Sequence, residues 1–494
     1  MSSAHTCRLN LQTRPVARAC AVVALGLGGA WMSVPAWAQA QPAKGSGDVA
    51  AEVKALKDRI EQLERKLDAQ QPGMTPEQQQ DFNRIAVKTE ALEDGRDMNG
   101  FKGLKVSGYI DPTYIYSQRQ HRAGFQLGNS VADDAYTFDD SYMGIAMLDF
   151  VKETDSGARW HLTLVPQRST QAVAEGSSSP LHEASVSVPL TDLQTRFIAG
   201  HIPDWSGYEM LQATLTKTIT HNLLFDTTLP ASYTGAGMEL TRDKWIIKSV
   251  VANMAASKRK PNEKTPVLAY RVDYAKGEFQ GFGFAGIHGR AANFATTSNT
   301  TYQDVYDTPG GNVIGVVPVT EDVAQRDSRL DTFEFDAYFI RGDFTAQGQV
   351  SWGRQLKASV TPAADGSLRT AYWSGLSGLL AYKFEPRLEG TVRMDYIFNK
   401  KNGGGLLTYA AFDGANGIGP SQVDADGDGN IDNPNKGVNR GALTLAMSYL
   451  FNLNTTFKVE YRHDWATGKV FEDTKSGTYR KSNDLLATAV VVSF

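Results

Sequence analysis

A short acidic stretch near residue 430 has the residue types and spacing of a calcium-binding loop. Oxygen-bearing side chains stand at alternate positions of this stretch, namely Asp424, Asp426, Asp428, Asn430 and Asp432. Carboxylates that alternate in this way can converge on a hard cation such as Ca²⁺, and Gly429 at the sixth position allows the bend of the loop. The twelfth position is Asn435 instead of glutamate and no helical pattern flanks the stretch, so we expect an isolated Ca²⁺ loop of weak affinity. A solvated acidic loop without an ion is the alternative.

Charged residues of opposite sign occur in two parts of the chain that could meet across a channel. The connection 203–231 carries Asp204, Glu209 and Lys217, and also Asp226. Basic residues also alternate with apolar ones in strand-like stretches, namely Lys105, Arg159, Arg196, Arg271 and Arg393. If the connection folds inward, its acids and the bases of the wall set a transverse field that sorts solutes by charge and dipole. We therefore expect a pore constriction from these residues, the alternative being that each is only a water-facing lumen residue.

The sequence contains no arrangement of residues that indicates catalysis. The glycines at 281, 283 and 286 match a dinucleotide fingerprint in letters only, because they lie inside a strand pattern with no helix after it. The histidines after residue 40 are not spaced as a metal pair, and no serine is singled out as a nucleophile by its surroundings. We predict that the protein is not an enzyme.

The elements that must position the charged residues are extended strands. In the last stretch, 483–494, one face of a period-two pattern is formed by Leu486, Thr488, Val490 and Val492, and the chain ends on Phe494. The same alternation recurs along the chain and predicts sixteen strands, at 104–116, 143–152, 159–166, 183–190, 193–202, 232–241, 245–254, 267–274, 279–288, 330–340, 344–356, 368–384, 387–399, 440–450, 456–465 and 483–494.

The connections between these strands alternate in length. Every second connection is a turn of about two to five residues, as expected for hairpins. The long connections are 117–142, 167–182, 203–231, 255–266, 289–329, 357–367, 400–439 and 466–482. Short turns at one end and long loops at the other are the layout of a barrel with a periplasmic and an outside face. We predict an all-β fold, a 16-stranded antiparallel transmembrane β-barrel over residues 104–494.

The two faces of these strands differ in polarity. In the stretch 456–465 the charged residues Lys458, Glu460, Arg462 and Asp464 alternate with aromatic and apolar ones. Charges of both signs are costly against lipid and suit water. Sixteen strands also leave room for an aqueous channel, so we expect a wet interior.

The N-terminal 40 residues are typical of a secretory signal peptide. Arg8, Arg14 and Arg18 precede a short apolar run, and small residues follow at Ala36 and Ala38. A membrane anchor is the alternative, although the run is short and contains two glycines. Both cysteines of the chain lie in this segment, so we expect a mature chain without cysteine, which fits an oxidising compartment.

Residues 41–99 are predicted to be a periplasmic linker and short coiled-coil helices. A heptad seam spaced by three and four residues runs through Val49, Val53, Leu56, Ile60, Leu63 and Leu67. Thr75 and Pro76 then restart a helix as cap and first-turn residue. We favour a coiled coil shared between protomers; an amphipathic hairpin under the barrel is the alternative.

The charge of the chain gives no support for a nucleic-acid partner. Removing residues 1–40, which hold three arginines and no acids, takes the formal net charge from −4 to −7. Average hydropathy is negative, which a barrel tolerates because only alternate residues face lipid.

Three runs in the barrel region resemble an uncharacterised porin-like family of proteobacterial outer-membrane proteins. They are VSGYIDPTYIY at 106–116, EASVSVPL at 183–190 and GHIPDWSGYE at 200–209. The layout of sixteen strands, helical extension and terminal phenylalanine is similar to that of trimeric sugar- or phosphate-selective porins. The resemblance implies a barrel in the cell outer membrane and a homotrimer, but no particular substrate.

Together these observations predict an outer-membrane porin through which small hydrophilic solutes diffuse passively. Outer-membrane lipid and two further copies of the chain are the expected partners, and Ca²⁺ in an outer loop is the only cofactor expected. Two alternatives stay open. One is a structural tether that links the outer membrane to the cell wall, and the other is a surface binding protein that uses the loops 289–329 and 400–439.

Overall fold

The computed structural model describes residues 76–98, 101–128, 143–167, 179–255, 266–291, 296–306, 311–324, 327–359, 367–399 and 414–494, together with positions 54, 57–59, 61, 62 and 363. The chain divides into two units, Met1–Lys102 and Gly103–Phe494, which are considered separately. The predicted signal peptide and the seam from Val49 to Leu67 lie outside the described residues.

The first unit contains the helix α3 (Pro76–Met98), which begins at the proline that the sequence analysis placed in a first turn. Proline suits this position because its fixed φ is helical and its missing N–H would have no partner there. Phe82, Ile85 and Val87 are more than half exposed. The helix is therefore confirmed, whereas the coiled coil stays a prediction.

No helix in the part of the chain that the structure describes is long and apolar enough to cross a membrane.

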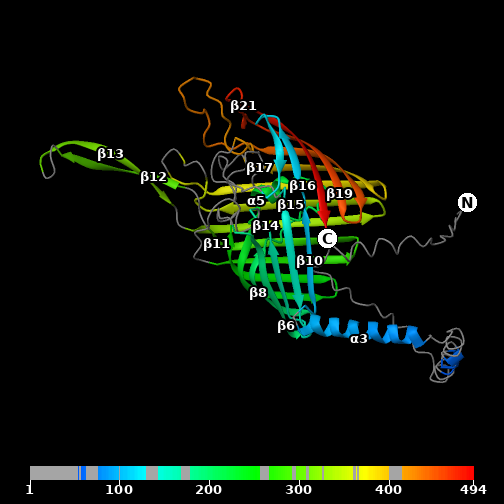
Figure 1. The fold of residues 1–494 in the computed structure, drawn as a ribbon. Coiled ribbons are helices and arrows are strands. Elements are labelled where there is room, and N and C mark those ends of the chain that lie inside the picture. The colour runs from blue at the N-terminus through cyan, green and yellow to red at the C-terminus, as the bar shows by residue number, and fades with distance from the viewer. Residues whose placement is uncertain are drawn as a thin grey trace, which may run out of the picture. The chain divides into compact units, whose positions relative to one another are not determined.

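The second unit is a closed antiparallel barrel (Figure 1). Its strands are β1 (Leu104–Ile110), β2 (Thr113–Ser117), β3 (Arg122–Gln126), β4 (Ala146–Glu153), β5 (Arg159–Leu164), β6 (Leu181–Asp192), β7 (Thr195–Pro203), β8 (Ser232–Arg242), β9 (Trp245–Ala255), β10 (Val267–Gly277), β11 (Gln280–Ala291), β14 (Ser328–Arg341), β15 (Phe344–Gln355), β16 (Ala371–Glu385), β17 (Leu388–Phe398), β18 (Arg440–Asn452), β19 (Thr455–Ala466) and β22 (Ser482–Ser493). The last strand, β22, pairs with β19 on one side and with β1 and β2 on the other, which closes the ring.

Two of the wall strands are each divided in two. β1 and β2 continue one another across Asp111 and Pro112, where proline has no N–H to donate to the ladder. β3 pairs with β2 and β4 pairs with β1, so β3 and β4 make one wall strand that residues 127–145 interrupt. Counting each divided strand once, the eighteen strands of the sheet make sixteen. The predicted number of strands and the antiparallel closure are therefore confirmed.

Three further strand pairings involve connections that the sequence analysis left as loops. β12 (Thr296–Tyr306) and β13 (Val313–Ala324) form a hairpin outside the barrel sheet, within 289–329 (Figure 1). β20 (Phe471–Asp473) and β21 (Thr478–Arg480) form a smaller one within 466–482. β3 lies in the predicted loop 117–142. The threonine- and valine-rich composition of β12 and β13 is a strand signal, and their place in a long connection hid it.

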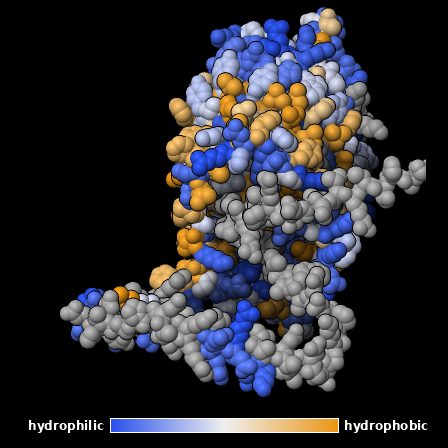
Figure 2. Space-filling view, turned by 90° about the vertical axis from the view of Figure 1, so that its right-hand side faces the viewer, coloured by the Kyte–Doolittle hydropathy of each residue, from blue (hydrophilic) through white to orange (hydrophobic). Residues whose placement is uncertain are grey.

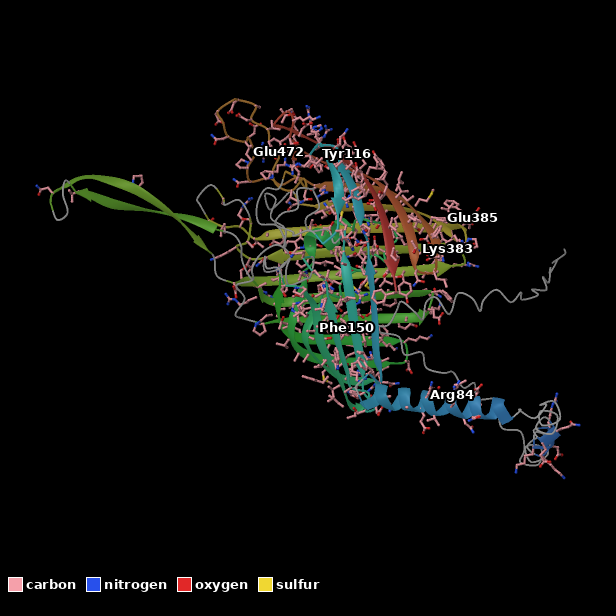
Figure 3. All side chains as sticks on the ribbon, in the orientation of Figure 1. Arg84, Tyr116, Phe150, Lys383, Glu385 and Glu472 are labelled. Atoms are coloured by element: carbon pink, nitrogen blue, oxygen red, sulfur yellow. The ribbon has the colours of Figure 1, made fainter. Side chains whose placement is uncertain are left out.

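The outward face of the barrel is apolar. On β17 the outward side chains Val392, Met394 and Phe398 are about half exposed, whereas the inward Arg393 and Asp395 are fully buried. Figure 2 shows hydrophobic residues gathered over the middle of the visible face, with hydrophilic residues above them. Charged side chains gather at the strand ends, as Lys383 and Glu385 do beside the short β16–β17 turn (Figure 3). This distribution suits a barrel wall whose middle faces lipid and whose two ends face water.

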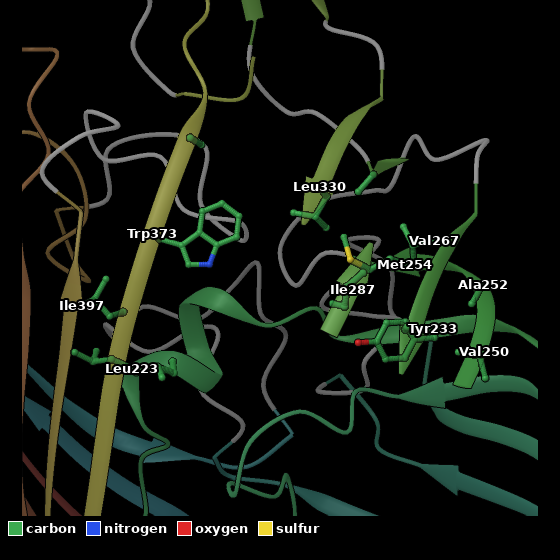
Figure 4. Packing of buried hydrophobic residues seen from close by; sticks show 14 of the residues in the cluster. Leu223, Tyr233, Val250, Ala252, Met254, Val267, Ile287, Leu330, Trp373 and Ile397 are labelled. Carbon is green, nitrogen blue, oxygen red and sulfur yellow. The ribbon is translucent and has the colours of Figure 1, made fainter. Parts of the chain in front are cut away.

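The interior of the barrel is less wet than predicted. On β22 the inward side chains Leu485, Ala487, Ala489 and Val491 are buried together with apolar residues of β1, β2 and the lumen. A larger apolar cluster joins inward residues of β7 to β18 near a helix inside the ring (Figure 4). Alternation identified the two faces correctly, but it could not show that inward apolar residues are covered by chain folded inside the ring.

Candidate functional site in the barrel lumen

The connection between β7 and β8, residues 204–231, folds into the barrel, as the sequence analysis expected. Its helix α5 (Leu223–Thr228) contacts the inner faces of β15, β16 and β17. Asn222 caps this helix, because its side chain accepts a hydrogen bond from the Phe225 N–H at 2.8 Å. Leu223 and Leu224 are fully buried in the cluster that also contains Trp373 (Figure 4). We call residues 204–231 the lumen segment.

Arg393 on β17 is the principal anchor of the lumen segment. Its side chain is 0% exposed, and its Nη1 donates to Glu209 Oε1 at 3.1 Å and to the Thr220 carbonyl oxygen at 2.7 Å. Its Nη2 donates to the His221 carbonyl oxygen at 2.8 Å, and its Nε donates to Asp395 Oδ2 at 3.2 Å. A guanidinium with this many directed partners holds backbone and side chain of the segment at once.

The wall strand β19, which is separated from β17 by β18, adds a row of charged anchors. Lys458 donates through Nζ to the Thr216 carbonyl oxygen at 2.6 Å. Glu460 accepts from the Thr220 N–H at 3.1 Å. Arg462, also fully buried, bonds the same part of the segment. The alternating charges that the sequence analysis read as water-facing therefore bind the lumen segment to the wall.

The beginning of the lumen segment is fixed to the opposite part of the wall. Asp204 accepts hydrogen bonds from the Tyr233 hydroxyl and, at 2.9 Å, from the Ser206 N–H. Arg271 on β10 donates through Nη1 to the Trp205 carbonyl oxygen at 2.8 Å. The segment is thus held to the wall at its beginning and again within residues 209–221, and its charges serve mainly to dock it.

One predicted constriction residue, Lys217, stays partly open to water inside the barrel together with a partner that was not predicted, Glu389. Lys217 of the lumen segment lies 2.8 Å from Glu389 of β17, with side chains 24% and 12% exposed. Arg271 is also partly exposed and pairs with Asp273 at 2.8 Å. Lys217 and Arg271 are therefore the predicted constriction residues whose side chains remain partly exposed to the lumen.

The other three basic residues lie at the short-turn ends of their strands. Arg159 pairs with Glu153 across the β4–β5 turn at 3.2 Å. Arg196 is buried and donates through Nη2 to the Gly157 carbonyl oxygen at 2.7 Å. Lys105 is exposed on β1. The structure brings Glu209 and Arg393 into direct contact but does not bring these three to the lumen segment; the constriction role of the set stays a prediction.

Sequence reasoning missed a polar cluster on the inner wall of β4 to β6. His161 lies between two carboxylates, with Nε2 at 2.6 Å from Asp149 Oδ1 and Nδ1 at 3.1 Å from Glu183 Oε1. The Thr163 hydroxyl donates to the same Asp149 oxygen at 2.6 Å. Polar residues at alternate positions of three consecutive strands were the available signal.

Burial changes the protonation of groups in the lumen segment. It raises the pKa of the Glu209 carboxyl to about 7, against the opposing effect of the Arg393 guanidinium. It lowers the pKa of the His221 imidazole to about 3, so the ring is neutral near pH 7 and can donate through Nε2 to the Met210 carbonyl oxygen at 2.8 Å.

The acidic loop brings together three of the five predicted Ca²⁺ ligands. Oxygens of Asp424, Asp426 and Asp432 lie within 4.8 Å of one another, and all three residues are exposed. Asp424 accepts hydrogen bonds from the N–H groups of Gly427 and Gly429, both of which have positive φ. Asp428 instead accepts from the Asn430 N–H at 2.8 Å. Hard oxygen donors of this kind fit Ca²⁺, but the full predicted ligand set does not converge.

A closed 16-stranded antiparallel ring with an apolar outer face and a segment folded inside it has the architecture of an outer-membrane β-barrel. The chain belongs to the family DUF3138, described as a protein of unknown function, whose model matches residues 32–494. No curated protein matches it.

Several solved structures are similar in fold. The trimer form of OmpT from Vibrio cholerae has 12% identity and a TM-score of 0.45, over 79% of this chain and 99% of that one. The outer-membrane channel DcaP of Acinetobacter baumannii has 9% identity and a TM-score of 0.44, over 79% and 97%. The anion-selective porin from Comamonas acidovorans has 8% identity and a TM-score of 0.45, over 79% and 99%.

Proposed function

We propose that this protein is a porin of the cell outer membrane, a water-filled channel through which small hydrophilic solutes diffuse passively. The observation that carries the proposal is the lumen segment, which charged residues of β10, β17 and β19 fix to the inner wall. A sixteen-stranded ring is wide enough for an aqueous path, and a fixed segment inside it narrows that path without needing to move.

Conductance in planar lipid bilayers tests the proposal. Purified full-length protein should produce discrete current steps that are stable over time and proportional to voltage. If the protein is folded, as judged by heat-modifiable migration, and inserts without producing conductance, the result would favour the structural tether or the surface binding protein. Pull-down with peptidoglycan, with and without residues 41–99, then tests the tether.

We propose that the narrow part of the path is formed by the predicted charges together with Glu389, which makes an exposed pair with the predicted Lys217. The other residues of the predicted set would act by holding the lumen segment, above all Asp204, Glu209, Arg271 and Arg393, or by setting the potential near the short-turn end, as Lys105, Arg159 and Arg196 would.

The reversal potential in a salt gradient separates these roles. Lys217→Gln should shift the channel toward cations and Glu389→Gln toward anions, because each removes one lumen charge of known sign. Lys276→Gln, at an exposed turn of β10, is the matched control and should leave the reversal potential unchanged. Equal shifts in all three variants would place the narrow part elsewhere.

We further propose that the protein assembles as a homotrimer. The exposed apolar side chains of α3 would be covered by the same helix of neighbouring copies. A shallow hollow on the barrel wall, lined by Trp160, Ala184, Val186 and Ala199, offers small residues against which a second barrel could pack. Mass measurement in mild detergent tests this, and a stable monomer with residues 41–99 intact would rule out the trimer.

Calcium binding by the loop 424–432 is proposed as a structural feature of the outer surface. Three exposed carboxylates that lie so close together repel one another, and a divalent cation would relieve that repulsion. Isothermal titration with Ca²⁺, compared between the wild type and Asp426→Ala with Asp428→Ala, tests the site directly.

A further inference from the structure

A cluster of arginines occupies the outward face of the barrel at the long-loop ends of β11, β14 and β15. Arg290, Arg329 and Arg354 come from these three strands, and their register places them beside one another: Arg290 pairs across from Arg329, and Arg354 pairs across from Asp331. The outward direction follows from alternation along β14. Leu330, which stands between Arg329 and Asp331, is fully buried in the lumen cluster, so its two neighbours point outward.

One carboxylate organises this cluster. Asp331 Oδ2 accepts from Arg329 Nε at 3.1 Å and from Arg354 Nε and Nη2 at 3.0 and 2.9 Å. Its other oxygen, Oδ1, lies 3.1 Å from His288 Nδ1. Asp331 is only 7% exposed, so it lies beneath the guanidiniums, and Arg329 is 62% exposed. The arrangement holds two guanidiniums in place, and among the described contacts Arg329 uses only its Nε.

The cluster lies next to the apolar outer wall. Phe333 and Trp352, two residues along from Asp331 and Arg354 on the same face, are both exposed. The His288 ring contacts the Tyr270 and Phe333 rings, and Arg354 lies over Trp352 at 6.0 Å. Arginine on the lipid face is costly at the bilayer centre and nearly free at the interface, so these residues mark the height of the outer headgroups. Aromatic side chains directly below them fit the same boundary.

We propose that this cluster binds the phosphate-bearing headgroup of an outer-leaflet lipid. The three arginines outnumber the two nearby aspartates, Asp331 and Asp327, the second of which contacts Arg290 through its carbonyl oxygen, so the site carries a net positive charge that a phosphate would neutralise. A planar guanidinium presents paired N–H donors that match phosphate oxygens, and Asp331 fixes the orientation of two such groups in advance. The acyl chains of the same lipid would lie along Phe333, Trp352 and the apolar wall. The site rests on the membrane placement of the barrel and not on its solute.

Native mass spectrometry of the full-length protein in detergent tests the proposal. The probe is a bis-phosphorylated, multiply acylated glucosamine disaccharide, titrated beside the same lipid without its phosphates. We expect the phosphorylated lipid to bind at least about tenfold more tightly. Equal affinity of the two lipids would overturn the proposal. Inorganic phosphate is the third probe, and full competition by it at equal concentration would show a site for free phosphate instead of a lipid.

Variants of Arg329 on β14 and Arg354 on β15, compared with an arginine at the other end of β14, make the comparison specific. Arg329→Gln with Arg354→Gln should weaken binding of the phosphorylated lipid about tenfold or more, and Arg329→Gln alone should weaken it by a smaller factor. Arg341→Gln is the matched control, because Arg341 is an exposed arginine at the opposite end of β14. Heat-modifiable migration confirms that each variant is folded. Unchanged affinity in the folded double variant, or an equal loss in Arg341→Gln, would overturn the proposal.

Discussion

Replacing Arg393 by methionine should release the lumen segment from the wall while leaving the barrel closed. The arginine is fully buried and ion-paired to Glu209 and Asp395, whose side chains are 4% and 0% exposed. Methionine keeps the apolar stem but removes every hydrogen bond of the guanidinium to the segment. The ring itself keeps its backbone ladder through β17, which pairs with β16 and β18 without help from this side chain.

The size of the effect follows from the two carboxylates left behind. Removing one partner of a buried ion pair costs about 3–5 kcal/mol, because the remaining charge stays out of water. Since about 1.4 kcal/mol corresponds to a factor of ten, the ratio of undocked to docked segment should rise by about 10²-fold to about 4 × 10³-fold. Protonation of Glu209 limits the cost. Burial already raises the pKa of Glu209 to about 7, against about 4.5 when the carboxyl is in water. Protonation of Glu209 therefore contributes fully to docking below about pH 4.5, and this contribution is lost as the pH rises through about 7.

Two measurements report the position of the segment. Limited proteolysis should cut Arg393→Met within 204–231 much faster than the wild type, and faster at pH 8 than at pH 5. Single-channel recordings should show larger and noisier open currents, because the segment no longer narrows the path at a fixed place. Arg387→Gln, at the exposed turn before the same strand, is the control and should behave as the wild type.

A charge-compensated variant separates buried charge from lost packing. Arg393→Met combined with Glu209→Gln and Asp395→Asn removes the stranded carboxylates, and it should recover part of the proteolytic protection. If the folded single variant is cut within about twofold of the wild-type rate at pH 8, the anchoring role assigned to Arg393 is wrong.

Three further outcomes are expected. Chelation of Ca²⁺ should speed proteolysis of the loop 424–432 and leave conductance nearly unchanged, and Asp426→Ala with Asp428→Ala should reproduce this; a shift in ion selectivity would contradict it. Deleting Phe494, whose backbone hydrogen-bonds to β1 at the closing seam, should lower the amount of heat-modifiable protein assembled in the outer membrane, and normal assembly would count against it. The hydrogen bond from His121 lowers the pKa of Asp473 to about 2, so the contact between the β2–β3 turn and the β20–β21 hairpin should hold at pH 4 and weaken toward pH 2; limited pepsin digestion, with Asp473→Asn sensitive at both pH values, checks this.

The sequence was sufficient for the wall of the barrel because alternation is a local property. A residue such as Val392 or Arg393 reveals its face through its immediate neighbours, and turn signals mark where each strand ends. The same locality explains the number of strands and the long and short connections.

The contacts of the lumen were not predictable in this way. Glu209 and Arg393 are 184 residues apart, and nothing near either one indicates that they meet. Lys458 and Glu460 look like residues that face water, because a strand pattern cannot tell water from the polar backbone of another segment. For the same reason the alternating oxygens from Asp424 to Asp432 could not show that Asp424, Asp426 and Asp432 lie together while Asp428 accepts from the Asn430 N–H.

The lumen segment also constrains the order in which the molecule can be made. It is bonded to β10, β17 and β19 and packs against β1 and β22, which are the first and last strands of the ring. A ring that closed first would have to admit a chain of this length through its own mouth and bring it to the buried arginines of the wall, Arg393 and Arg462. Entry before closure is the simpler route, so the seam between β1 and β22 should be sealed late, around chain that is already inside. Until the seam closes, β22 is an unpaired strand with two largely apolar faces, and such a strand can pair with the wrong neighbour. Its early capture by assembly machinery would protect the protein from aggregation.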